Sequence, residues 1–170
     1  LNIWPDLRDH LSEITVLDPA CGSGSFLVGM LYILNDLYIR IDKNLAIDRT
    51  PYQRKMAIVG NSLYGVDIKS WAVHISELRL WLQLVVETQI IPAELKFKPL
   101  LPSLSFKIRV GDSLVQEIGG IDLNLNRARG QIAPQLGARL TKLKSEKMKF
   151  FNNYPSQKYH SVEGLKHEEL

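Results

Sequence analysis

The architecture of this chain follows from one short segment near its start, which reads Val16-Leu17-Asp18-Pro19-Ala20-Cys21-Gly22-Ser23-Gly24-Ser25-Phe26-Leu27. The pattern predicts a buried strand, then a tight glycine turn, then a long apolar helix. Such an arrangement places backbone N–H groups and the positive end of a helix beside one carboxylate, that of Asp18. The segment therefore predicts a pocket for a small ligand that carries both a carboxylate and an amine.

The predicted elements alternate in the order of a doubly wound parallel sheet. Helices are predicted at residues 7–11, 27–41, 51–60 and 71–87, and strands at residues 13–17, 63–68 and 104–110. The first strand suits a central position covered on both faces, whereas the alternating third strand suits a position nearer the sheet edge. Thr50 and Ser70 are expected to cap helices, and Gly60 to end one. We therefore expect an α/β fold with a parallel sheet.

Beyond Gly119-Gly120 the pattern changes to a helix with a basic face. Apolar residues recur at helical spacing between positions 136 and 151, with lysine and arginine residues between them. This favours a surface helix whose basic side faces solvent, and a contact with DNA is the alternative.

Length and composition indicate one globular domain with a core of its own. The chain has 170 residues, of which 45% are hydrophobic and 23% charged, and its formal net charge is +3. These values are ordinary for a soluble protein. The mildly basic balance permits a nucleic-acid partner, although a solvated lysine-rich face would give the same count.

The sequence gives no sign of a disulfide, a metal site or a membrane segment. Cys21 is the sole cysteine, which favours a reducing compartment, and the histidines show no ligand-like spacing with it. The most apolar stretch, 26–34, is far too short to span a bilayer, and no signal peptide is visible. We therefore expect a cytoplasmic protein without a metal. Because the chain starts at Leu1, we expect a piece of a longer polypeptide, with a processed whole protein as the alternative.

Three carboxylates, those of Asp18, Asp67 and Asp112, come at or just after the ends of the predicted strands. Parallel strands end at one edge of a sheet, where ligands bind. Asp18 could accept from an ammonium group, Asp67 from ribose hydroxyls and Asp112 from the amino group of adenine, with Ile68 on the ring face. Singly, each aspartate is more often a turn or helix cap. Together with the glycine turn they describe a nucleoside that carries an amino acid.

Two other nucleotide sites fit the sequence poorly. In dinucleotide enzymes the acidic residue follows the glycines by about 20 positions, whereas Asp67 follows Gly24 by more than twice that separation, and the third glycine is missing. A phosphate-binding P-loop is excluded as well, because no Gly-Lys-Ser/Thr follows the turn.

The same segments resemble the motifs of a known family. Residues 18–27 resemble the first motif of the adenine-specific DNA methyltransferases that modify an exocyclic amine, and residues 61–68 resemble the second. The helix over 72–81, with Leu78-Arg79-Leu80-Trp81-Leu82, is similar to that of type IIG restriction–modification enzymes. Residues 108–114 resemble the third motif of that branch, so the resemblance covers roughly residues 7–120.

The resemblance implies a site for S-adenosylmethionine. Its methionine end would be held by Asp18, Ala20, Gly22 and Gly24, its ribose by Asp67, its adenine face by Ile68 and its adenine edge by Asp112 and Ser113. The implied fold is the Rossmann-like parallel sheet of class I methyltransferases, incomplete, with a helical C-terminal extension. Residues 1–120 would be the cofactor-binding part, and residues 121–170 a helical insertion or linker before the missing catalytic motif.

The chain departs from the family in its chemistry. The catalytic motif Asn/Asp-Pro-Pro-Tyr/Phe is absent, since no Pro-Pro occurs in the sequence, and Asn153-Tyr154-Pro155 has the wrong order. No catalytic residue is therefore assigned. Near the turn, we expect Phe26 in the core, with a packing contact to the ligand as the alternative. Cys21 should be a small buried neighbour and His74 a structural histidine on a buried helix.

These observations predict a fragment, inactive on its own, of a DNA adenine methyltransferase from a restriction–modification system. The full-length protein would transfer methyl from S-adenosylmethionine to the exocyclic amine of adenine in double-stranded DNA. A noncatalytic scaffold or specificity subunit is one alternative. A methyltransferase that acts on RNA or protein is another.

Overall fold

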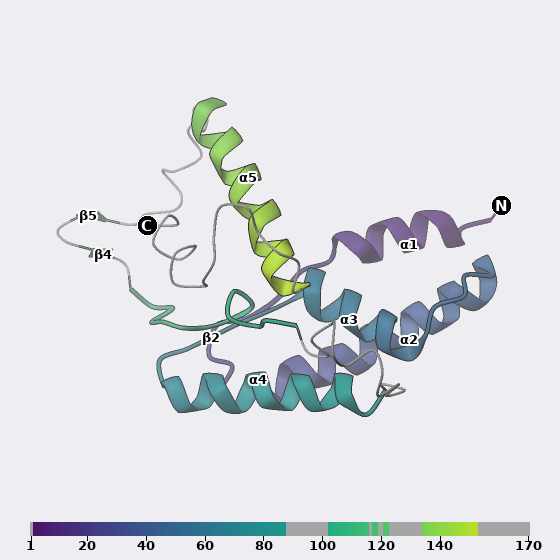
Figure 1. Ribbon diagram of the computed structural model, residues 1–170, viewed down its shortest axis with the longest axis horizontal. Helices are drawn as coiled ribbons and strands as arrows, with labels where there is room; N and C mark the ends of the chain where they lie inside the picture. The colour runs from purple at the N-terminus through teal and green to yellow at the C-terminus, as the bar shows by residue number, and fades with distance from the viewer. Residues whose placement is uncertain (1, 88–101, 116, 119–120, 123–133, 153–170) are drawn as a thin grey trace, which may run out of the picture.

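The structure is a computed structural model that describes residues 2–87, 102–115, 117–118, 121–122 and 134–152 (Figure 1). Its elements run in the order α1 (Trp4–Glu13), β1 (Val16–Asp18), α2 (Ser25–Leu45), α3 (Pro51–Asn61), β2 (Leu63–Asp67), α4 (Ser70–Val85), β3 (Ile108–Val110), β4 (Glu117–Ile118), β5 (Ile121–Asp122) and α5 (Pro134–Phe151). The predicted α/β class is therefore confirmed.

The main sheet has three parallel strands in the order β1-β2-β3. Asp18 pairs with Gly65, and Asp67 pairs with Val110, so the carboxyl ends of all three strands lie at one edge. This small parallel sheet is compatible with a Rossmann-like fold. The short β4 and β5 form a separate antiparallel pair.

The first predicted strand was placed wrongly in two respects. Glu13 closes α1, and the strand begins only at Val16. Within the described residues, β2 lies at the centre of the sheet and β1 at an edge. Side chains alternate between faces along a strand, so Val16 packs against the core while Leu17 is 61% exposed on the other face.

The third strand lies at the sheet edge of the described residues, as predicted, but it is shorter than expected. The amides of Lys107 and Ile108 both donate to the carbonyl of Leu104, which makes a local turn where the sequence pattern predicted a strand. This turn leaves only Ile108–Val110 to pair with β2.

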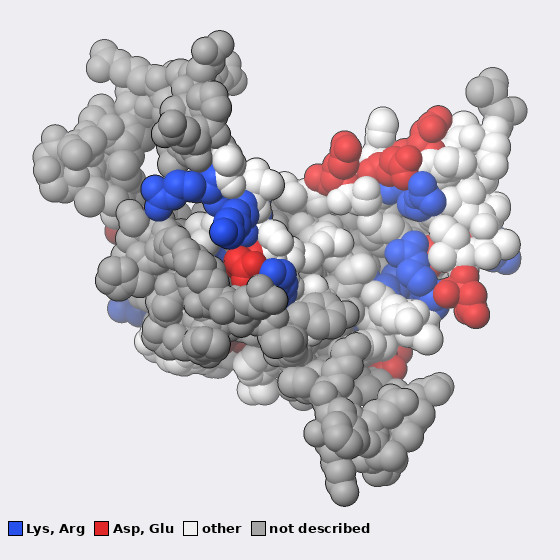
Figure 2. All heavy atoms as spheres, turned by 45° about the horizontal axis from the view of Figure 1, so that its top comes forward, with Lys and Arg blue, Asp and Glu red and all other residues white. Residues whose placement is uncertain are grey.

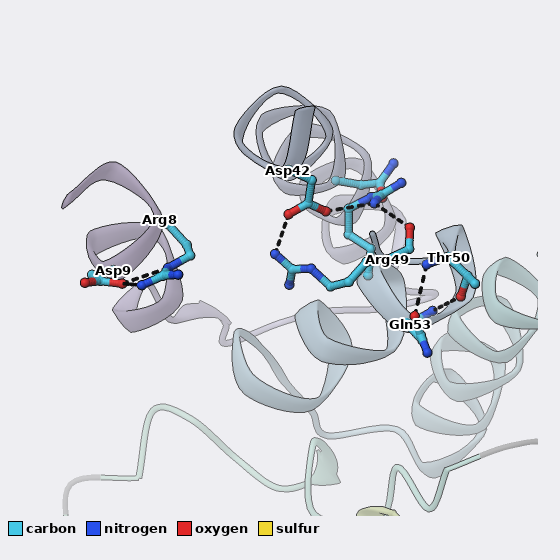
Figure 3. A network of polar contacts seen from close by, with 8 residues as sticks. Arg8, Asp9, Asp42, Arg49, Thr50 and Gln53 are labelled. Atoms are coloured by element: carbon cyan, nitrogen blue, oxygen red, sulfur yellow. Dashed lines mark hydrogen bonds and ion pairs between the residues drawn. The ribbon is translucent and has the colours of Figure 1, made fainter. Parts of the chain in front are cut away.

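Of the three residues predicted to start or end a helix, Thr50 is confirmed, whereas Ser70 and Gly60 are not. Thr50 caps α3 as predicted: its hydroxyl accepts from the amide of Gln53, whose side chain in turn accepts from the amide of Thr50 (Figure 3). Ser70 is not a cap, because α4 begins at Ser70 itself after Lys69. Gly60 does not end α3, which continues to Asn61.

The core lies between the sheet and one layer formed by α2 and α4. Buried positions recur along α2 at helical spacing and meet buried residues of α4 and of the strands. The largest fully buried side chains of α2, α4 and the strands are Leu27, Leu31, Ile41, Leu63, Leu80, Leu84 and Ile108. The long apolar helix predicted after the glycine turn is therefore confirmed.

Helix α5 stands apart from this layer and reaches α3 with its C-terminal end (Figure 1). There Phe151 is buried against Gly60, where a Cβ atom would lie 2.5 Å from its ring. Figure 2 shows basic side chains gathered on this part of the surface. Lys149 pairs with Glu146 at 2.6 Å and Lys147 lies over the Phe106 ring. The solvated face, with a DNA contact as its alternative, stays a prediction for this helix.

The glycine turn between β1 and α2 requires glycine at two positions. Gly22 has φ +52° and Gly24, the residue before α2, has φ +78°. A Cβ atom on Gly24 would lie 2.4 Å from the hydroxyl oxygen and 3.1 Å from the Cα of Ser76, so α4 packs directly against the turn. A Cβ atom on Gly22 would meet nothing within 4 Å.

A buried ionic network fixes the connection between α2 and α3 (Figure 3). The Asp42 carboxylate, 4% exposed, accepts from the guanidinium groups of Arg49 and Arg54, the latter at 2.9 Å. Arg54 also donates to the side chain of Asn35 and to the carbonyl of Arg49, both at 3.2 Å. This network was not predicted.

Replacement of Gly24 by alanine should destabilise the fold more than replacement of Gly22. Each variant forces alanine into left-handed backbone, which costs about 1–2 kcal/mol. Gly24→Ala also presses a methyl group onto Ser76, which adds about 1–3 kcal/mol. Urea unfolding followed by circular dichroism measures both losses. Equal losses would show that α4 does not pack against the turn.

Replacement of Asp42 by alanine should lower the free energy of unfolding by about 3 kcal/mol, because Arg54 keeps a buried charge without its carboxylate. Asp36→Ala is the matched control on the same helix, since it removes an exposed ion pair with Arg40. This control should lower the free energy of unfolding by only about 0.5 kcal/mol. The same urea titration compares the two, and similar losses would contradict the structural role of Asp42.

Candidate functional site

The three aspartates predicted as ligands lie at the same edge of the sheet. Asp18 ends β1 and Asp67 ends β2, while Asp112 follows the end of β3 after Gly111. The glycine turn leaves the same edge, because it follows Asp18 directly. The structure thus brings together segments that are far apart in the sequence.

Asp67 joins the glycine turn to the end of β2. Its Oδ2 accepts from the amide of Gly22 at 2.8 Å, and its Oδ1 accepts from the amide of Lys69 at 2.9 Å. Beside it, the amide of Cys21 donates to the carbonyl of Val66 at 2.9 Å. The turn is therefore attached to β2 by one backbone and one side-chain hydrogen bond.

These contacts keep Asp67 ionised. The amides of Lys69 and Gly22 donate to the carboxylate and hold its pKa below the ordinary value, and the nearby charge of Lys69 acts in the same direction. Each carboxylate oxygen has a second lone pair, so Asp67 can still accept hydrogen bonds from a ligand.

Asp18 and Asp112 each make a local turn. Asp18 Oδ1 accepts from the amide of Ala20 at 3.2 Å, and Asp112 Oδ1 accepts from the amide of Leu114 at 2.9 Å. Each contact leaves further acceptor positions on the carboxylate. Both aspartates thus have the turn-forming role that was expected as the alternative for a single aspartate at a strand end.

The loop after β3 reaches the loop after β1. The hydroxyl of Ser113 donates to the carbonyl of Pro19, in a close contact between residues 94 positions apart. The amide of Gly111 donates to the carbonyl of Asp67 at 2.9 Å. The ends of all three strands are thereby linked to one another. Ile68, immediately after β2, is 63% exposed and presents an apolar side chain at this edge.

Cys21 is a buried residue of the turn, as predicted. It is 5% exposed and lies against Gly65, where a Cβ atom would stand 3.1 Å from its sulfur. Burial raises the pKa of the Cys21 thiol, and the charges of Asp18 and Asp67 raise it further. A thiol in these surroundings is a poor nucleophile.

Two predictions about neighbouring side chains were wrong. Phe26 is 54% exposed instead of lying in the core, because α2 buries Leu27 and Val28. His74 is exposed as well. Apolar residues occur on both faces of α4, so their density suggested a fully buried helix, although the face with His74 is open.

Sequence reasoning assigned no role to the two α4 residues that contact the glycine turn. Ser76 packs under Gly24, and Arg79 donates to the carbonyl of Ser23 and to the hydroxyls of Ser23 and Ser25. The sequence contained one indication of a shared role, because the two residues are three positions apart and therefore lie on the same face of the helix.

The described residues include no group of three or more histidine, cysteine or acidic side chains that could hold a metal ion. Among the helices of the described part of the chain, none is both long and apolar enough to cross a membrane. The site thus consists of backbone amides, carboxylates and an exposed apolar side chain, which together can bind a small ligand with both anionic and cationic groups.

Comparison with known proteins gives the family. Residues 3–117 match the model of the MmeI DNA-methyltransferase domain. A candidate type II restriction enzyme and methyltransferase of Methanocaldococcus jannaschii is 43% identical over 119 residues, 70% of this chain and 10% of that protein. DNA methyltransferase A of Bacillus subtilis is 31% identical over 77 residues, 45% of this chain and 9% of that protein.

The chain spans about a tenth of the length of these relatives. No solved structure matches it. The family match covers both the glycine turn and all three strands of the main sheet. The chain therefore belongs to the MmeI DNA-methyltransferase domain family of type II restriction–modification systems.

Proposed function

We propose that this chain is the cofactor-binding part of a DNA methyltransferase that transfers methyl from S-adenosylmethionine to the exocyclic amine of adenine. The observation that carries the proposal is the hydrogen bond from the Gly22 amide to Asp67. It places a glycine turn, a helix N-terminus and an ionised carboxylate side by side at the end of a parallel strand. The family match supports a methyltransferase at this site.

The chemistry of the residues fits this cofactor. Its methionine end would lie against Ala20, Gly22 and Gly24, where the positive start of α2 favours the carboxylate. Its ammonium group would be held by Asp18 and its ribose hydroxyls by Asp67.

The adenine ring would lie on Ile68, whose exposed side chain offers an apolar surface. Its amino edge would face Asp112 and Ser113, which follow β3. This assignment uses each strand end for one part of the same molecule, which is how open parallel sheets bind nucleotides.

When bound, S-adenosylmethionine supplies an activated methyl group on its sulfonium centre. The residues of this chain hold and orient it, and orientation is a large part of the rate enhancement for a bimolecular transfer. The target adenine would be turned out of the DNA stack to reach it. No residue of this chain is assigned to the step itself, since the sequence lacks the family's Pro-Pro catalytic motif.

The proposal extends to the organisation of the protein. Residues 1–120 would form the cofactor-binding part of a Rossmann-like class I methyltransferase domain, and residues 121–170 a helical insertion before the catalytic strand. Double-stranded DNA would be the partner of the full-length protein, and the cytoplasm its location.

A second candidate is a noncatalytic scaffold or specificity subunit that keeps the fold. An RNA or protein methyltransferase is a third. The full-length protein that carries this sequence distinguishes them when it is incubated with S-adenosylmethionine and unmethylated DNA.

Digestion of that DNA and mass spectrometry should reveal N6-methyladenine, formed only when both substrates are present. Methylation of cytosine alone, or of RNA or protein in place of DNA, would contradict the assignment of the target. Cofactor binding without any methylation would favour the scaffold.

Asp67→Asn should weaken the binding of S-adenosylmethionine by about tenfold to 100-fold. The change removes a charged acceptor for the ribose, and hydrogen bonds to charged groups contribute about 1.5–3 kcal/mol. Calorimetric titration measures the dissociation constant. Asp36→Asn, on the exposed surface of α2, is the control and should bind as the wild type does.

The affinity of the wild type should also be constant from about pH 7 to about pH 5, because the pKa of Asp67 lies below its ordinary value and the carboxylate stays charged there. Loss of affinity within this interval, or unchanged binding by Asp67→Asn, would contradict the role of Asp67.

A further inference from the structure

We propose that Arg79 of α4 is a positioning residue that holds the glycine turn in the form that binds the amino-acid end of the cofactor. This inference rests on the proposed function and assigns a specific task to a residue outside the cofactor contacts. It concerns affinity for the methionine end of the ligand, and not for its nucleoside end.

One nitrogen of Arg79 contacts both sides of Gly24. Its Nη1 lies 2.7 Å from the hydroxyl oxygen of Ser25 and 3.1 Å from that of Ser23, and 3.3 Å from the carbonyl oxygen of Ser23. The two hydroxyl oxygens are 3.4 Å apart. The guanidinium therefore closes the turn across the residue that precedes α2.

Ser76 contacts the turn from the same face of α4. It is fully buried and leaves no room for a side chain at Gly24. Ser76 thus limits how far the turn can move toward α4, while Arg79 prevents it from moving away. The two residues act as a support for the turn, built on a helix that is anchored in the core by Leu80 and Leu84.

The turn needs this support because two glycines give it little stiffness of its own. Gly22 and Gly24 both have positive φ, and glycine has the widest choice of backbone conformations. Asp67 fixes the turn at Gly22, and Arg79 fixes it at Ser23 and Ser25. Backbone amides bind an anion well only when they are already oriented toward it.

The charge of Arg79 acts in the same direction. A guanidinium beside the first residues of α2 adds to the positive end of the helix. The ligand's carboxylate would therefore be favoured there, whereas the uncharged nucleoside end gains nothing from it. This difference separates a positioning role from a general contribution to folding.

The test measures the binding of two ligands to the wild type and to three variants of the full-length protein. The ligands are S-adenosylmethionine and 5′-methylthioadenosine, which lacks the amino-acid end. The variants are Arg79→Met, Arg79→Lys and, as the control, Arg40→Met, which removes an exposed ion pair from α2. Calorimetry gives the dissociation constants, thermal unfolding gives Tm, and hydrogen exchange reports the turn amides.

Arg79→Met should bind S-adenosylmethionine about tenfold to 100-fold more weakly, as expected when a supporting contact of a binding group is lost. Its affinity for methylthioadenosine and its Tm should match those of Arg40→Met. Arg79→Lys should lie between the wild type and Arg79→Met, because it keeps the charge and loses the planar donor. The amides of residues 22–26 should exchange faster in Arg79→Met.

Wild-type affinity of Arg79→Met for S-adenosylmethionine would overturn this inference and leave the proposed function intact. Equal weakening for both ligands together with a lower Tm would also overturn it, in favour of a purely structural arginine. Failure of the wild type to bind S-adenosylmethionine would overturn the proposed function, and this inference with it.

Discussion

The hydrogen bond between the Gly22 amide and the Asp67 carboxylate is the contact on which the site depends. It joins residues 45 positions apart and holds the glycine turn against the end of the central strand of the described sheet. Because the same carboxylate also accepts from the Lys69 amide, Asp67 fixes the start of α4 as well. One ionised side chain thus positions two loops, and α4 in turn contacts the turn again through Ser76 and Arg79.

The sequence was informative at the glycine turn and at Thr50, where neighbouring residues decide the structure. The glycine turn was predictable because Gly22 and Gly24 adopt a backbone form that other residues avoid. The cap at Thr50 was predictable from the residues that follow it. The parallel arrangement of the strands followed from their alternation with helices, which forces each strand to return in the same direction.

The parts that could not be predicted depend on contacts between distant residues. The sequence pattern predicts Leu17 as a core residue, yet its side chain is exposed. Nothing in its own segment shows what covers either face of β1. The pairing of Asp42 with Arg49 and Arg54 depends on how α2 and α3 pack together. The contact of Arg79 with Ser23 depends on how α4 lies beside the turn. Side-chain identity alone gives none of these distances. The common location of Asp18, Asp67 and Asp112 was predictable because the carboxyl ends of parallel strands share an edge.

The central claim is that the glycine turn binds the methionine end, and Asp67 the ribose, of one molecule, S-adenosylmethionine. A crystal structure of the full-length protein with S-adenosylhomocysteine tests this most directly. The ligand's carboxylate should lie beside Gly22 and Gly24 at the start of α2, its ribose hydroxyls on Asp67 and its adenine over Ile68. A ligand bound elsewhere, or bound here with its ribose away from Asp67, would contradict the account.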